Sequence, residues 1–216
     1  MHHGFLESLD HLWPELEKLL NSQPIQNDLK GGKPLYVTGH SKGGALAQLA
    51  ACRLARRGYR PAAVYTFAGP RPGDAGFATA FDSNFPNALR FEYRDDLVPH
   101  VPPATGSWLS ILRGLRVINL KFPLETPHVS LISRAARVFD ELVARLETGL
   151  PSYSSCGQLQ FIDWNDAIQP ESRELTMKRN LSLAQEVAEF KLPEIIGDHS
   201  SDGGYCRVPC GAPCSP

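Results

Sequence analysis

One pentapeptide constrains the fold of this chain more than any other segment. Gly39-His40-Ser41-Lys42-Gly43 lies between a short apolar run, Leu35 to Thr38, and a strong helical pattern, Ala45 to Arg57. It matches the G-x-S-x-G nucleophile elbow, a sharp turn from a strand into a helix. Glycines are expected on both sides of the turn because the two backbones come into close contact there. The pattern predicts an exposed Ser41 hydroxyl at the carboxyl end of a strand, and the alternative is an ordinary helix cap.

The rest of the chain alternates between strand and helix patterns. Strand-like apolar runs follow the elbow at 62–67, 88–93 and 157–164, and helical spacing occurs at 5–20, 75–81, 127–150 and 172–190. Residues 21–34 are polar and predict a loop. Strands that alternate with helices form parallel sheets. The expected fold class is therefore α/β, a mostly parallel sheet with flanking helices.

The composition is that of an ordinary globular chain. Of its 216 residues, 42% are hydrophobic and 21% charged, which is enough to bury a core in one domain. The formal net charge of −1 gives no electrostatic reason to expect nucleic acid as a partner. No run reaches the length of a transmembrane helix, and residues 1–5 lack the plan of a secretory signal. We expect a cytosolic protein if Met1 is the natural start, and a secreted one if an upstream segment was lost.

The five cysteines do not define a metal site. Cys52 falls in the helix after Ser41 and is expected to be a small buried hydrophobe. Cys206, Cys210 and Cys214 lie in a Gly/Pro-rich tail, with spacings wider than C-x-x-C and no obvious fourth ligand. We expect a loose tail over 206–216 with incidental thiols, and a metal site there is the less favoured alternative.

A serine nucleophile needs a base, and the base needs an orienting acid. On an elbow of this type the order along the chain is serine, acid, histidine, with the acid in a loop after a later strand. Asp95 and Asp96 fit that position. The histidines that follow are His100, close to the acid, His128, at the start of a helical pattern, and His199, in a polar loop.

Four segments resemble the class 3 (fungal-type) lipases of the α/β-hydrolase fold. They are His3-Gly4-Phe5 before a helix, Val37 to Ala47 around the elbow, Tyr65 to Asp74, and Arg94 to Pro103. Asp198-His199, with Tyr205 after it, is similar to the family's terminal Asp-His. The resemblance is specific over about 3–103, local around 199 and absent over about 104–194. It implies one α/β-hydrolase-like domain over 1–205.

The resemblance also implies roles for individual residues. Ser41 would be the nucleophile, Asp96 the acid and His199 the base, with the backbone N–H of Lys42 as one oxyanion donor. Asp198 and Arg71 would hold loops through local bonds. The side chains expected at the substrate cleft are His40, Val98 and Trp108.

The chain departs from the family pattern in three places. Lysine stands at position 42, where leucine is usual, and its ammonium is expected to reach water or pair with a carboxylate in the cleft. The long spacing from Asp96 to His199 predicts a helical insertion over about 104–150, whose Trp108–Leu120 run either overhangs the cleft or packs outside it. The resemblance implies several strands, a lid helix and an oxyanion residue before His3-Gly4-Phe5, and this sequence begins at that point, as expected of a fragment, a truncated product or a chain that completes its sheet with a partner. We therefore expect a domain truncated at its N-terminus, with an open sheet edge where a second copy could pair.

The function that the resemblance implies is serine-dependent hydrolysis of lipid carboxylic esters through an acyl-enzyme on Ser41. Such an enzyme would be a triacylglycerol lipase or a related esterase, would need no metal or organic cofactor, and would contact a lipid interface peripherally. The alternative is a catalytically impaired lipase-like domain that acts in binding or assembly, because the oxyanion-hole segment is missing. A thioesterase or peptidase is a third reading, disfavoured by the segments that carry the resemblance.

Overall fold

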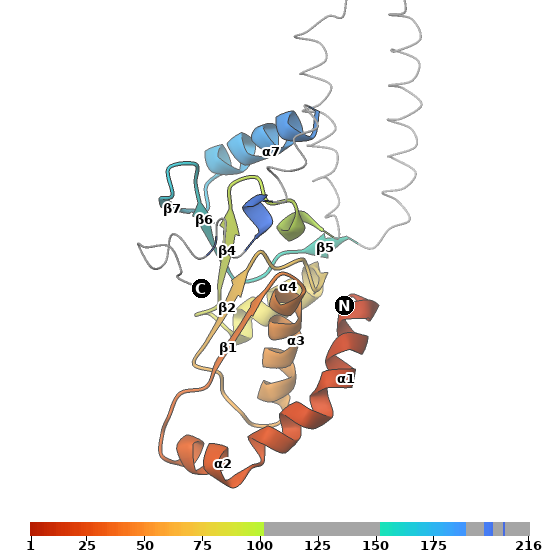
Figure 1. Ribbon diagram of the computed structural model, residues 1–216, viewed down its shortest axis with the longest axis vertical. Helices are drawn as coiled ribbons and strands as arrows, with labels where there is room; N and C mark the ends of the chain where they lie inside the picture. Colours follow the sequence, from red (N-terminus) through yellow and green to blue (C-terminus); the bar gives the residue numbers. More distant parts are fainter. Residues whose placement is uncertain (102–151, 189–196, 201–204, 206–216) are drawn as a thin grey trace, which may run out of the picture.

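The computed structural model describes residues 1–101, 152–188, 197–200 and 205, and every structural statement below concerns these residues (Figure 1). Among them, a five-stranded sheet has the order β1-β2-β4-β6-β7, in which the first four strands are parallel and β7 is antiparallel to β6. The strands are β1 (Tyr36–His40), β2 (Ala63–Phe67), β4 (Leu89–Tyr93), β6 (Gln158–Ile162) and β7 (Ile168–Pro170). A small antiparallel sheet pairs β3 (Gly73–Asp74) with β5 (Tyr153–Ser154).

Within residues 1–101 and 152–188 the helices are α1 (His3–Leu20), α2 (Gln23–Lys30), α3 (Lys42–Arg56), α4 (Ala75–Asn84) and α7 (Arg173–Ala188), with a 3-10 turn η1 (Val98–His100). The predicted α/β class and its strands and helices are confirmed where the structure describes them. The loop expected over 21–34 is wrong, because α2 lies within it. Pro24 occupies the first turn of α2, where the missing N–H of proline leaves no hydrogen bond unmade. The predicted insertion, Trp108, His128 and the cysteine tail lie outside the described residues.

Helix α3 is held on two sides by apolar clusters. Figure 1 shows α1 lying alongside it, and Leu9 and Trp13 of α1 pack there with Leu49 and Leu54. A second cluster joins α3 to β2 and α4, with Ala51, Val64 and Phe81 among its members. Burial of this kind stabilises by roughly 1.5–3 kcal/mol for each large apolar side chain. The first turn of α3 is thereby fixed relative to the sheet.

Three parallel strands end in the same way. Directly after β1, β2 and β4 stands a non-glycine residue with positive φ: Ser41 at 54°, Ala68 at 52° and Arg94 at 40°. Each also continues the strand pairing through its N–H, with Ser41 bonding Phe67 O at 2.9 Å, Ala68 bonding Phe91 O at 3.1 Å and Arg94 bonding Ile162 O at 3.0 Å. The backbone therefore leaves the sheet sharply at three neighbouring points, which gathers the three following loops at one edge.

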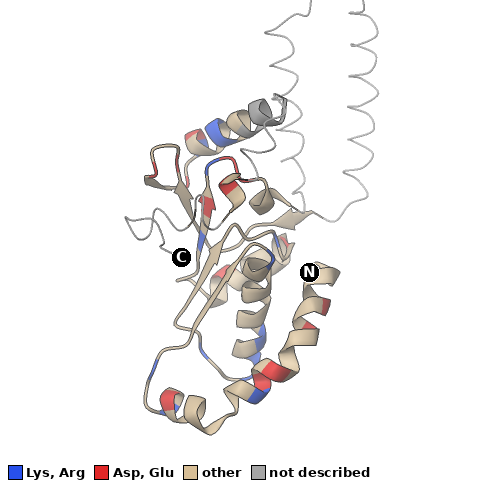
Figure 2. Ribbon diagram, in the orientation of Figure 1, with Lys and Arg blue, Asp and Glu red and all other residues tan. Residues whose placement is uncertain are grey.

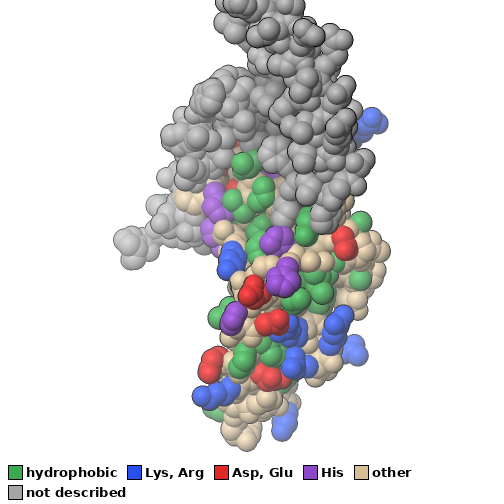
Figure 3. All heavy atoms as spheres, turned by 90° about the vertical axis from the view of Figure 1, so that its right-hand side faces the viewer, with side chains coloured by type: hydrophobic (Ala, Val, Ile, Leu, Met, Phe, Trp, Pro, Cys, Tyr) green, Lys and Arg blue, Asp and Glu red, His purple; other side chains and the backbone are tan. Residues whose placement is uncertain are grey.

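Charge is distributed without a patch of one sign on the face shown in Figure 3. Lys, Arg, Asp and Glu side chains are interspersed there with apolar ones. In the sheet, β1 and β2 carry no charged residue, whereas β4 carries Arg90 and Glu92 (Figure 2). No helix among the described residues is both long and apolar enough to cross a membrane.

Candidate active site

The turn between β1 and α3 depends on two glycines. A Cβ on Gly39 would lie 2.1 Å from the carbonyl oxygen of Gly43, and a Cβ on Gly44 would lie 2.8 Å from the Cα of Gly69. Nothing lies within 4 Å of a Cβ built on Gly43. The expectation that both glycines of the pentapeptide are needed for close contact therefore holds for Gly39 and is wrong for Gly43, since Gly44 makes the second close approach.

Ser41, His199 and Asp96 come together at the edge where the strands end. His199 Nε2 lies 2.9 Å from Ser41 Oγ, and His199 Nδ1 lies 3.1 Å from each oxygen of the Asp96 carboxylate. These residues are separated by up to 158 positions in sequence. The sequence analysis selected all three, and the structure places them in an unbroken chain of hydrogen-bond contacts.

The hydrogen bonds define which ring nitrogen of His199 carries the proton. A carboxylate can only accept, so Nδ1 must donate to Asp96. In the neutral ring Nε2 is then the acceptor, and the Ser41 hydroxyl donates to it. This arrangement can accept a proton from Ser41 Oγ as that oxygen attacks an electrophile.

Asp96 is almost fully buried, with 2% of its surface exposed. Burial raises the pKa of its carboxyl, and hydrogen bonds from Tyr205, the Val98 N–H and His199 act against that rise. The Tyr205 hydroxyl donates to Asp96 Oδ2 at 2.7 Å, and the Val98 N–H donates to Oδ1 at 2.9 Å. The same Tyr205 oxygen accepts the Tyr93 N–H at 2.9 Å. Asp96 is thus oriented by three donors from different parts of the chain.

The other candidates for acid and base lie elsewhere. Asp95 turns away from His199, because its Oδ2 accepts from Trp164 Nε1 at 2.8 Å and from Ser182 Oγ at 3.1 Å. His100 lies beside Arg179, and burial together with the surrounding guanidiniums lowers the pKa of His100 to about 4. It is neutral at pH 7 and does not contact Ser41 in the described structure.

The remaining predicted site residues surround this centre at different distances. His40 Nε2 lies 3.0 Å from the backbone oxygen of His199, so it donates there and stays clear of the Ser41 hydroxyl. Val98 contributes its N–H to Asp96. Lys42 is exposed at the start of α3 and forms no ion pair within the described residues, and its N–H donates to none of their backbone oxygens. Trp108 lies outside the described part of the chain.

Two neighbouring features were missed by the sequence analysis. The hydrogen bond from Tyr205 to Asp96 joins residues 109 positions apart, and no local pattern around Tyr205 indicates a buried hydroxyl. Arg90, Glu92 and Arg179 form a buried ionic group behind the Asp96 loop. The alternation of Arg90 and Glu92 in an otherwise apolar strand was the available signal. Among the described residues no three His, Cys, Asp or Glu side chains are grouped so that they could hold a metal ion.

A parallel sheet with a serine on a strand–turn–helix, and a histidine and aspartate beside it, defines the α/β-hydrolase class. Three solved lipases share that fold with this chain. Lip2 of Yarrowia lipolytica matches with a TM-score of 0.51 and 22% sequence identity, covering 92% of this chain and 55% of Lip2. An MDLA variant of Penicillium cyclopium matches with a TM-score of 0.50 and 22% identity, covering 82% of this chain and 50% of the variant. A triacylglycerol lipase described as having a serine protease triad at its catalytic centre matches with a TM-score of 0.50 and 20% identity. The match covers 84% of this chain and 56% of that lipase.

The sequence comparison is narrower and names the family. Residues 1–106, slightly less than half of the chain, match the family model "Lipase (class 3)", so this segment belongs to the class 3 lipase family. It is 45% identical over 102 residues to secreted mono- and diacylglycerol lipase A of Penicillium cyclopium, covering 46% of this chain and 31% of that protein. It is 33% identical over 117 residues to a lipase of Rhizopus niveus, covering 50% of this chain and 28% of that lipase. The matched segment spans less than a third of the length of these relatives.

Proposed function

We propose that this chain hydrolyses carboxylic esters of lipids, with Ser41 as nucleophile, His199 as general base and then acid, and Asp96 as the group that orients His199. The observation that carries this proposal is the contact of 2.9 Å between His199 Nε2 and Ser41 Oγ, in line with the contacts of 3.1 Å between Nδ1 and Asp96. Membership of the lipase family supports an ester of a lipid as the substrate.

The reaction follows from the direction of these hydrogen bonds. Ser41 Oγ attacks the acyl carbon while its proton passes to His199 Nε2, and the Asp96 carboxylate stabilises the resulting imidazolium. The N–H of Lys42 points from the first residue of a helix, where the backbone dipole is positive, and stabilises the oxyanion. The alcohol leaves with the proton from His199. Water then attacks the acyl carbon of acyl-Ser41 while His199 takes its proton, and that proton returns to Ser41 Oγ as the carboxylic acid leaves.

A serine-reactive fluorophosphonate probe tests this assignment. We expect labelling of the folded chain that disappears in Ser41→Ala and His199→Ala and persists in Ser83→Ala, a matched change at an exposed serine of α4. Hydrolysis of p-nitrophenyl butyrate and of emulsified diacylglycerol should likewise be lost in Ser41→Ala and His199→Ala and retained in Ser83→Ala. Absence of labelling in chain shown to be folded by circular dichroism would favour the catalytically impaired alternative.

The same proposal extends to surroundings and assembly. Exposed Leu12, Leu16 and Leu19 share one side of α1, which supports peripheral contact with a lipid interface. Sedimentation with neutral vesicles measures that contact.

The edge of the sheet supports pairing with a second copy, because β1 pairs with β2 alone among the described strands. Light scattering measures the oligomeric state. Secretion rests on the description of the Penicillium relative and is tested by assaying culture medium.

A further inference from the structure

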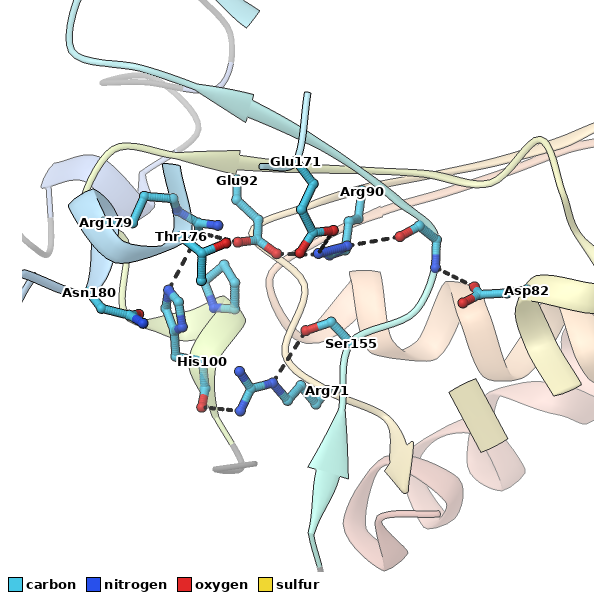
Figure 4. Close-up of a pocket in the computed structure, with 12 residues that line it drawn as sticks. Arg71, Asp82, Arg90, Glu92, His100, Ser155, Glu171, Thr176, Arg179 and Asn180 are labelled. Atoms are coloured by element: carbon cyan, nitrogen blue, oxygen red, sulfur yellow. Dashed lines mark hydrogen bonds and ion pairs between the residues drawn. The ribbon is translucent and has the colours of Figure 1, made fainter. Parts of the chain in front are cut away.

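A second cavity lies behind the Asp96 loop, between β4, β5 and α7 (Figure 4). Its volume is about 340 Å³, and its walls include Arg71, Arg90, Glu92, His100, Thr176 and Arg179. Ser41, Asp96 and His199 do not line it. The cavity is therefore separate from the proposed site of ester hydrolysis.

Positive charge exceeds negative charge at the centre of this cavity. Arg90 Nε donates to Glu92 Oε1 at 3.0 Å, and Arg179 Nη2 donates to Glu92 Oε2. The side chains of Arg90, Arg179 and Glu92 are only 14%, 8% and 7% exposed. Two buried cations thus share one buried carboxylate. At the exposed rim, Arg90 Nη2 also lies 3.5 Å from Glu171 Oε2, and Asp82 Oδ1 accepts the Gly157 N–H at 2.6 Å.

His100 does not change this balance of charge. It is neutral at pH 7 and its Nε2 lies 3.5 Å from Arg179 Nη2. Buried charges in proteins are normally balanced by an opposite charge, because the cost of leaving one uncompensated is several kcal/mol. The centre of the cavity therefore favours a bound anion.

Arg179 also has hydrogen-bond donors without acceptors. All its hydrogen bonds to described residues use Nη2, and its Nε is completely buried with no partner among them. Nη1 makes no hydrogen bond or ion pair to a described residue either. One face of the guanidinium is covered by the Phe161 ring, 4.4 Å from Cζ to the ring centroid, so acceptors can approach only in its plane. Planar pairs of N–H groups match the oxygens of phosphate or carboxylate.

We propose that this cavity binds a small oxyanion of the phosphate or sulfate class between the guanidiniums of Arg90 and Arg179. The Asn180 amide lines the same cavity and offers a neutral hydrogen bond to one of the ligand's remaining oxygens. The site is independent of ester hydrolysis, since none of the residues assigned to that reaction takes part. Binding would brace α7 against β4 and η1.

Inorganic phosphate is the probe, added to the full chain at constant ionic strength maintained with sodium chloride. We expect a saturable rise in Tm of about 3–5 °C when phosphate reaches ten times its Kd. Asn180→Asp adds a negative charge at the wall of the cavity at nearly constant side-chain size and should abolish the saturable rise. Asn27→Asp makes the same change on α2, far from the cavity, and should leave it intact.

Isothermal titration calorimetry on the same three proteins gives a second readout. A Kd in the micromolar to millimolar range for the parent chain and Asn27→Asp, weakened at least ten-fold in Asn180→Asp, supports the site. The absence of saturable binding to the parent chain would overturn it and leave a water-filled cavity. An equal Kd in Asn180→Asp would also overturn it, because the anion would then bind elsewhere.

Discussion

The orientation of Asp96 depends on a tyrosine hydroxyl that works in two directions. Tyr205 donates to Asp96 and accepts from the backbone of Tyr93, and only 3% of Tyr205 is exposed. Its oxygen therefore connects the end of β4 to the proposed acid. In the proposed reaction Tyr205 would therefore act through Asp96, as a positioning residue.

Tyr205→Phe should lower kcat and leave KM for a soluble ester nearly unchanged. A hydrogen bond to a charged group contributes about 1.5–3 kcal/mol, so we expect a fall of roughly ten-fold or more in kcat/KM. Stopped-flow measurement of p-nitrophenyl butyrate hydrolysis checks this, with Tyr36→Phe at an exposed position as the matched control. An unchanged kcat in a folded Tyr205→Phe variant would show that Asp96 is oriented without the hydroxyl.

Asp198, next to the proposed base, predicts a pH dependence of stability. Burial raises the pKa of Asp198 to about 6, and the Asp95 and Asp96 carboxylates add to the rise, while the Asp95 N–H and Arg94 oppose it. Because the folded state binds this proton more tightly than the unfolded state, stability falls as the pH rises from about 4 to about 6. It then stays lower above pH 6.

Asp198→Asn should remove this loss. The asparagine oxygen can still accept the Asp95 N–H, which Asp198 Oδ2 accepts at 3.3 Å. We expect equal Tm values for the two proteins near pH 4 and a higher Tm for the variant above pH 6. Differential scanning calorimetry across pH 4–8 measures both curves. A Tm difference that does not change with pH would contradict the raised pKa.

At the residue scale the sequence predicted best what its motifs contain. Ser41 follows from the elbow, whereas Asp96 and His199 were selected from several candidates by resemblance. Asp95 lies away from His199 because Trp164 and Ser182 bind its carboxylate from distant parts of the chain. Contacts between residues so far apart in sequence are created by the fold and leave no local pattern.

The elements around the elbow are packed at the closest distance their backbones allow. A Cβ on Gly44 would lie 2.8 Å from the Cα of Gly69, and no side-chain rotation can separate a Cβ from a backbone atom. The position of the loop after β2 relative to α3 is therefore set by the absence of a side chain. Gly43, one residue earlier, faces open space.

Gly44→Ala and Gly43→Ala make a matched pair for testing this contact. Gly44→Ala should destabilise by about 1–3 kcal/mol, because overpacking forces the backbones apart. Gly43→Ala should be neutral or stabilise by up to about 1 kcal/mol, since alanine favours the helix. Urea unfolding followed by circular dichroism measures both. Equal free energies of unfolding for the two variants would contradict the close approach.

Periodicity found the large elements but not the smaller ones. The alternation of apolar runs and helical spacing predicted β1, α3, β2 and β4 to within a few residues. The helix α2 was missed because its eight residues are mostly polar, and the three-residue β7 is too short for a pattern. The antiparallel pairing of β3 with β5 joins segments about 80 positions apart and has no signal in either one.

For the molecule as a whole, a buried carboxylate connects α7 to the sheet. Glu92 of β4 binds Arg179 of α7, and both side chains are buried. Burial alone would raise the pKa of Glu92, but Arg179 and Arg90 lower it to about 2. The stability this provides is present above pH 4.5 and is lost as the pH falls toward 2.

Glu92→Gln should remove this acid sensitivity at a cost in stability. A shift from 4.5 to about 2 corresponds to roughly 3 kcal/mol that the parent chain loses between those pH values. The variant should be less stable at pH 7 by about 3–5 kcal/mol, because the buried guanidiniums lose their charged partner. Below pH 4.5 its free energy of unfolding should change less with pH than that of the parent chain. Glu7→Gln on an exposed part of α1 is the control. Identical acid unfolding of parent and Glu92→Gln would contradict the lowered pKa.

The three positive-φ residues at the ends of β1, β2 and β4 have a consequence for how the proposed site is maintained. Each such conformation costs on the order of 1–3 kcal/mol for a residue with a side chain, and the unfolded chain bears none of that cost. Only at position 41 does the proposed chemistry call for the side chain. Ala68 packs into a cluster with Tyr93 and Tyr205, and the Arg94 guanidinium covers the Tyr93 ring at 4.6 Å. The geometry of the edge is therefore imposed by the interior around it, and we expect a change that loosens this packing to disturb the alignment of Ser41, Asp96 and His199.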